Sequence, residues 1–142
     1  MAGLFDLDTT APDHPAVHIA DRAAADAKES ADTAEHVARN GCPQMAMAGT
    51  LRHLEDAKRH HFTAEDAAER VGTSDARRFA DAAHGHVVRA AAAYRHACEA
   101  AGRQEFNREA PATETRTWDE LDTLEQSQWI VFAYASTPKW IR

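Results

Sequence analysis

Two alanine-rich stretches predict long helices: VHIADRAAADAKESADTAEHVA at residues 17–38 and ARRFADAAHGHVVRAAAAYRHACEAA at residues 76–101. In each stretch an apolar residue recurs at alternating spacings of three and four, the pattern of a helix with one packed face. We call these positions the alanine seams, and we expect the two helices to pack on each other through them. The seam positions are Val17, Ala20, Ala24, Ala27, Ala31, Ala34 and Ala38 in the first stretch and Ala76, Ala80, Ala83, Val87, Ala90, Tyr94, Ala97 and Ala101 in the second.

The composition favours a small all-α domain. Of the 142 residues, 32 are Ala and only 20 are Leu, Ile, Val or Phe. Because Ala is the strongest helix former, this composition predicts a compact bundle of four or five helices with Ala-rich heptad seams. A core built mostly of methyl groups is thin for a chain of this size, so we expect a homo-oligomer or a protein partner to add stability.

Turn and capping residues divide the chain into segments. Asn40-Gly41, Gly72 and Gly102 are typical of helix C-termini, and Thr63 and Thr117 begin capping-box patterns. Gly85 lies inside an expected helix and predicts a bend or a close contact there. We expect a flexible arm at residues 1–12 and one helical domain at residues 13–142, with a candidate sub-unit at 103–142 that begins with a polar linker at 103–116. The expected helices lie near 14–40, 43–61, 64–71, 74–101 and 118–135.

Charge and targeting features exclude several classes of function. The net charge is −7, which disfavours non-specific binding to nucleic acid. No apolar stretch approaches the roughly 18 residues of a membrane span, and the N-terminus lacks the pattern of a signal peptide. With only two cysteines, a disulfide framework is not expected. We therefore expect a cytoplasmic protein without a membrane partner, located in the host cytoplasm if a phage encodes it.

Residues 63–89 have the pattern of a helix-turn-helix. A short helix at 63–71, a turn at Gly72 and a second helix with two arginines near its start are typical of this DNA-binding motif. Thr73, Ser74, Arg77 and Arg78 would then contact DNA. A helical hairpin without DNA-binding activity gives the same pattern, and the acidic chain favours that alternative.

Histidine is abundant, with nine residues. His14, His18 and Asp21 fall on one helix face at spacings of four and three, a pattern that suits a metal ion. Solvent-exposed ion pairing on a charged helix explains the same spacing. Neither the Glu-x-x-His pairs of di-iron bundles nor His-Glu-x-x-His occurs in the sequence, so no metal cofactor is expected.

The aromatic residues gather near the C-terminus. Trp118, Trp129 and Trp140 all fall in the last 25 residues, and the run WIVFAYA at 129–135 is apolar on all sides, typical of a buried helix or, as the alternative, a strand. Tryptophan and arginine are enriched in binding hot spots. We place the partner- or ligand-binding surface here and expect core packing for Trp118 and Trp129 and a surface role for Trp140. The candidate binding residues are Trp118, Trp129, Tyr134, Trp140, Arg103 and Arg108.

The same region resembles a known repeat. Cys98-Glu-Ala-Ala-Gly102, followed after a loop by Trp118-Asp-Glu-Leu121 and Glu125-Gln-Ser127, is similar to the bacterial and phage form of the ryanodine-receptor repeat. In that family a helix with a similar ending is followed by a tryptophan and an acidic-glutamine segment, and the loop here is longer. The resemblance implies a small helical module that binds a nucleotide-like ligand.

The sequence contains no glycine-rich phosphate loop, no serine nucleophile elbow and no recognisable pair of catalytic carboxylates. We therefore expect a non-enzymatic helical interaction module, an accessory protein of a bacterium or phage that binds a protein or a small ligand. The alternatives are a DNA-binding regulator that uses 63–89 and a binder of nucleotide-like ligands that uses the C-terminal region.

Overall fold

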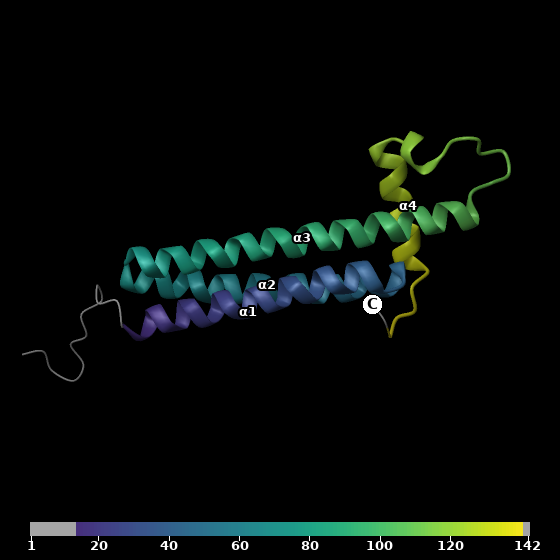
Figure 1. The fold of residues 1–142 in the computed structure, drawn as a ribbon. Helices are drawn as coiled ribbons and strands as arrows, with labels where there is room; N and C mark the ends of the chain where they lie inside the picture. The colour runs from purple at the N-terminus through teal and green to yellow at the C-terminus, as the bar shows by residue number, and fades with distance from the viewer. Residues whose placement is uncertain (1–13, 141–142) are drawn as a thin grey trace, which may run out of the picture.

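The computed structural model describes residues 14–140, which form four α-helices, one 3-10 turn and no strand. The expected all-α fold is confirmed. Three long helices lie side by side as an up-down-up bundle, and a shorter helix lies across one end of it (Figure 1). The predicted arm at residues 1–12 lies outside the described residues. The elements are α1 (Pro15–Asn40), α2 (Pro43–Val71), α3 (Ser74–Glu109), the 3-10 turn η1 (Trp118–Glu120) and α4 (Thr123–Ala135).

The alanine seams form the core of the bundle, as predicted. Every seam alanine except Ala38 is buried, and the partly buried Val87 and Tyr94 pack against the same core. α2 completes the core with an apolar face of its own that includes Met47 and Leu54. Each buried methyl group contributes only about 0.8 kcal/mol. The stability of the bundle therefore depends on many small contacts along long helices.

The separate short helix predicted at 64–71 is wrong, because α2 runs without a break from Pro43 to Val71. The Thr63 hydroxyl, expected to cap a new helix, instead donates a hydrogen bond to the Arg59 carbonyl one turn earlier (3.2 Å). Ala57 and Ala64 are both buried, so the apolar face continues across the expected break. Packing against α1 and α3 outweighs the local capping signal.

α3 is longer than predicted, because Gly102 lies inside the helix rather than at its end. The helix continues to Glu109, and the buried Phe106 anchors this extension. The first part of the predicted linker, 103–109, is therefore helical. Gly85 was expected at a bend or a close contact, but α3 is continuous there and a Cβ at Gly85 would meet no atom within 4 Å.

The last helix begins later than predicted. Residues 118–120 form a single 3-10 turn, in which the Glu120 carboxylate accepts a hydrogen bond from the Thr117 N–H (3.1 Å). α4 itself starts at Thr123, after a reciprocal cap in which Asp122 accepts from the Glu125 N–H (2.8 Å) and Glu125 accepts from the Asp122 N–H (3.3 Å). Two successive capping boxes thus turn the chain before α4.

The packing of the seams can be tested by overpacking. Ala90 is fully buried, so Ala90→Leu should lower the free energy of unfolding by about 1–3 kcal/mol. Ala82 lies exposed on the same helix, and Ala82→Leu should change it by less than about 0.5 kcal/mol. Urea unfolding followed by circular dichroism measures both. Equal effects of the two substitutions would contradict the assignment of the seam.

Candidate functional site

Three aromatic residues, Phe106, Trp118 and Trp129, pack together where α4 meets α3, and we call this contact the α3–α4 joint. The ring of Phe106 on α3 lies 6.2 Å from the ring of Trp118 and 5.6 Å, edge to face, from the ring of Trp129 on α4. Trp118 is only 5% exposed. The Gln126 side-chain amide donates a hydrogen bond to the Trp118 carbonyl oxygen (2.9 Å). These contacts hold η1 and α4 across the end of α3.

Gly102 allows this close approach. A Cβ at this position would lie 2.6 Å from Cγ1 of Ile130 and 2.8 Å from Cη2 of Trp118. It would also lie 3.3 Å from the backbone nitrogen of Ile130, so the side chains alone cannot relieve the conflict. The glycine that the sequence predicted as a helix end therefore serves as the contact point for α4.

α4 has an inner face against α3 and an outer face open to solvent. Ala133 is fully buried, whereas Leu124, Val131 and Phe132 are 69%, 65% and 62% exposed. Helix formation at 129–135 is confirmed, but the expected burial is wrong, because only one side of α4 meets the bundle. We define the outer face as the residues that line a shallow apolar groove of about 440 Å³: Leu124, Ser127, Gln128, Val131 and Phe132.

The predicted aromatic residues share this end of the molecule but differ in environment. Trp118 is a core residue and Trp129 is partly buried against it, so the expected core packing is confirmed for Trp118 and holds in part for Trp129. Tyr134 and Trp140 are exposed, Trp140 by 79%, as expected for Trp140. The residues of the outer face were not among the predicted site residues. Their spacing along an apolar helix was the available signal.

Arg103 and Arg108, predicted to bind a ligand, both face carboxylates. Arg103 lies 3.6 Å from Asp119. Arg108 forms an ion pair with Glu105, a carboxylate whose residue is only 4% exposed, and also lies 3.3 Å from Glu109. A buried carboxylate without its cation is strongly destabilising. Arg108 therefore has a structural role, because its positive charge balances the negative charge of the buried Glu105 carboxylate.

The region predicted as a helix-turn-helix is the end of a long antiparallel hairpin. Residues 63–71 are the last turns of α2, which lies alongside α3 rather than crossing it (Figure 1). Gly72 ends α2 in the left-handed conformation (φ 68°), and the Thr73 hydroxyl caps α3 by accepting from the Ala76 N–H (3.2 Å). Ser74 is simply the first residue of α3. The two helices of a helix-turn-helix meet at a steep angle instead.

The arginines of that region are already neutralised. Arg77 pairs with Glu65 on α2 and lies 3.3 Å from Asp81, and Arg78 lies 3.0 Å from Asp75. The Arg77 hydrogen bond also lowers the pKa of the Glu65 carboxyl, so this carboxylate remains charged. DNA phosphates would have to displace these partners. The geometry therefore gives the DNA-binding alternative no support.

The predicted metal ligands are not assembled into a site. The His14 Nδ1 atom accepts a hydrogen bond from the Ala16 N–H (3.0 Å) and caps α1. His18 and Asp21 are exposed on the same helix. Within residues 14–140, no group of three or more His, Cys, Asp or Glu side chains is arranged to hold a metal ion.

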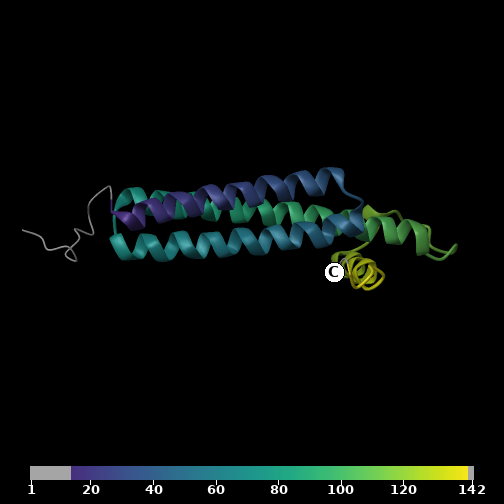
Figure 2. The same cartoon turned by 90° about the horizontal axis from the view of Figure 1, so that it is seen from below.

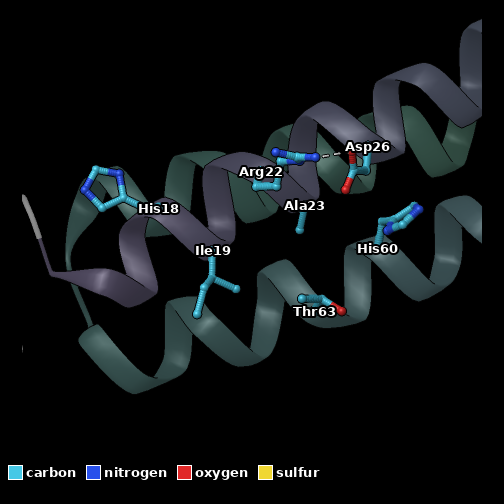
Figure 3. A pocket seen from close by; sticks show the side chains of 7 residues that line it. All are labelled: His18, Ile19, Arg22, Ala23, Asp26, His60 and Thr63. Carbon is cyan, nitrogen blue, oxygen red and sulfur yellow. Dashed lines mark ion pairs between the residues drawn. The ribbon is translucent and has the colours of Figure 1, made fainter.

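A groove of about 310 Å³ lies between α1 and α2 near the start of α1. Figure 3 shows His18 and His60 at opposite ends of this groove, with Ile19 and Ala23 between them. Arg22 and Asp26 line the groove one turn apart on α1, and their side chains lie 3.6 Å from each other, so their charges balance. The groove thus brings no two imidazoles together. The lining residues are His18, Ile19, Arg22, Ala23, Asp26, His60 and Thr63.

A groove of about 470 Å³ between α1 and α3 is crossed by an ionic cluster. Arg89 of α3 donates to Asp32 of α1 (2.5 Å) and to Glu35. These hydrogen bonds lower the pKa of Asp32 to about 2 and lower that of Glu35. The guanidinium is thus occupied by two carboxylates of its own chain and is not available to an anionic ligand.

Comparisons of this chain with family models, curated proteins and solved structures gave no match. The resemblance to the ryanodine-receptor repeat and its nucleotide-like ligand therefore stay predictions. In the structure, Cys98 is buried and Gly102 packs against Trp118. Burial also raises the pKa of the Cys98 thiol. These residues of the resemblance hold α4 in place, and Cys98 is kept in its unreactive thiol form.

The α3–α4 joint can be tested at its glycine. Gly102→Ala should lower the free energy of unfolding by about 1–3 kcal/mol, because the added methyl group meets Ile130 and Trp118. Gly85→Ala on the same helix meets open space and should raise it by about 0.5–1 kcal/mol through helix propensity. Thermal and urea unfolding measure both. Stabilisation by Gly102→Ala would show that α4 does not pack there.

The Arg89 cluster predicts a pH dependence of stability. The pKa of Asp32 is lower in the folded protein than its ordinary 3.8, so its contribution is complete above that value and is lost as pH falls toward about 2. Arg89→Gln should therefore lower the free energy of unfolding at about pH 6. The difference in free energy of unfolding between the variant and the wild type, measured by urea unfolding, should shrink as the pH falls toward about 2. Arg95→Gln, at an exposed position of the same helix, is the control. A difference that does not change with pH would contradict this account.

Proposed function

We propose that the protein is a non-enzymatic helical interaction module that binds a protein partner through the outer face of α4. The observation that carries the proposal is the exposure of Leu124, Val131 and Phe132 on a helix that the bundle covers on one side only. Burial of each such side chain is favourable by about 1.5–3 kcal/mol. A partner that covers all three gains most of this free energy.

The exposed large apolar residues are concentrated towards the C-terminal end of the described residues. Nine large apolar side chains are exposed in the described residues, and five of them lie between residues 124 and 140: Leu124, Val131, Phe132, Tyr134 and Trp140. Scattered exposed apolar residues are normal on a protein surface, whereas a contiguous patch such as Leu124, Val131 and Phe132, which line one groove, is typical of an interaction site. The exposed residues also include Tyr134 and Trp140, types that are enriched in binding hot spots.

The charge of α4 favours a protein over the other large partners. Glu125 is its only charged residue, and Arg116 holds that carboxylate at 2.7 Å. Nucleic acids and anionic lipid surfaces are bound through lysine and arginine, which the outer face lacks. The net charge of −7 adds repulsion. Within residues 14–140, no helix has the length and apolar character that crossing a membrane requires.

Photo-cross-linking in cells that produce the protein tests the proposal. A photoreactive phenylalanine analogue in place of Gln128, at the centre of the outer face, should give a discrete cross-linked protein product. The same analogue in place of Glu69, near the opposite end of α2, should not. Phe132→Gln, added to the variant labelled at 128, should reduce the product strongly, because it replaces an exposed apolar contact with a polar side chain.

Both labelled positions are exposed, so the melting temperature should stay close to that of the wild type and serves as the folding control. The absence of a product from position 128 would contradict the proposal. Equal products from positions 128 and 69 would contradict it too. Preferential binding of the purified protein to anionic lipid vesicles through the same face would show that the partner is a membrane rather than a protein.

A further inference from the structure

We infer that the partner of the outer face is a second copy of this chain, with the two α4 helices packed antiparallel around a two-fold axis. The inference rests on the proposed function and adds the identity and the direction of the partner. Three observations lead to it: the even placement of two apolar residues along α4, the charges at the two ends of that helix and the position of α4 outside the bundle.

Two large apolar residues of the outer face are placed evenly about Gln128. Leu124 lies four residues before Gln128, and Phe132 lies four residues after it. In an antiparallel pair centred on Gln128, Leu124 of each copy packs against Phe132 of the other. The Gln128 side-chain amide carries both a hydrogen-bond donor and a hydrogen-bond acceptor. Two Gln128 side chains that meet on the two-fold axis can therefore hydrogen-bond to each other. A two-fold interface requires this kind of self-complementary surface.

The charges at the two ends of α4 select the antiparallel direction. Asp119, Glu120 and Asp122 lie at the N-terminal end, and Lys139 follows the C-terminal end. Antiparallel packing brings the acidic end of one copy to the basic end of the other, whereas parallel packing would bring like charges together. Glu120 and Asp122 are used as caps. Asp119 lies 3.6 Å from Arg103, but its side chain is 85% exposed, so among these carboxylates it is the one open to Lys139 of the second copy.

The position of α4 leaves room for a second copy. Figure 2 views α4 along its own axis and shows it beside the bundle rather than between its helices. The exposed residues of the outer face lie on the side that α3 does not cover. The outer face is therefore open to a second α4.

The size of the face sets the expected strength of the dimer. α4 has 13 residues, so a pair of these helices is in contact over about 20 Å. This is at the small end of specific protein interfaces. We therefore expect a reversible dimer with a Kd on the order of micromolar to tens of micromolar.

Sedimentation velocity of the purified full chain over a concentration series tests the inference. The wild type should change from monomer to dimer across a range of about 1–500 μM, which brackets the expected Kd. Phe132→Gln should weaken the dimer at least about tenfold, because each copy loses an exposed apolar contact and the symmetry doubles the effect. Glu69→Gln, at the other end of the bundle, should leave the dimer unchanged.

A charge exchange tests the direction of packing. Lys139→Glu and Asp119→Lys should each weaken the dimer, since each places like charges together at both ends of the interface. The double variant should restore it. The effect of each single variant should also become smaller in about 1 M salt, where the screening length falls to about 3 Å. Failure of the double variant to restore the dimer would overturn the antiparallel arrangement.

The remaining outcomes separate this inference from the proposed function. A wild type that stays monomeric over the whole series would overturn the second copy as partner. So would a dimer that Phe132→Gln leaves unchanged. If position 128 then still cross-links a different protein in cells, the proposed interaction surface stands while the inference fails. If position 128 cross-links no protein at all, both fail.

Discussion

Close packing of the long helices through alanine determines how the other parts of the structure are arranged. A seam of methyl groups gains little per contact, so the bundle reaches its stability through length, with helices of 26, 29 and 36 residues. Because the seams consist mainly of alanine, several of the few large apolar residues lie outside them. Phe106, Trp118 and Trp129 gather at one end, where α3 extends beyond the bundle and holds α4.

The sequence predicts the seams and most helix ends well, and it fails at the boundaries where a local signal competes with packing. The spacing of Ala76, Ala80 and Ala83 repeats over many helical turns, so a single unusual residue does not obscure the pattern. Helix ends depend on single residues, whose signals compete with packing. Thr63 and Gly102 both carry a local signal for a boundary, and in both places burial of neighbouring residues continues the helix. For the candidate site, residue type pointed to the tryptophans, whereas the exposure of Leu124, Val131 and Phe132 follows from the way α4 packs on α3 and could not be predicted from their type.

The electrostatic arrangement of the described residues supports an apolar rather than an ionic mode of recognition. Arg77, Arg78 and Arg108 are predicted from the sequence to contact DNA or a ligand, and each of them faces a carboxylate of its own chain. Exposed pairs of this kind add little stability individually, but they remove the cations that a phosphate would need. The outer face of α4 lies apart from this pairing, and its groove is lined by apolar and uncharged polar side chains alone.

Hydrogen–deuterium exchange of the backbone amides in α4, followed at several protein concentrations, tests whether α4 depends on a partner for its stability. We expect that the three long helices are stable by themselves, whereas α4 packs on α3 through one face only and needs a partner to cover the other. At low concentration the amides of residues 124–135 should exchange faster than those in the centres of α1 and α3, and their protection should rise with concentration. Protection of α4 that equals that of α1 and α3 and does not change with concentration would contradict this expectation.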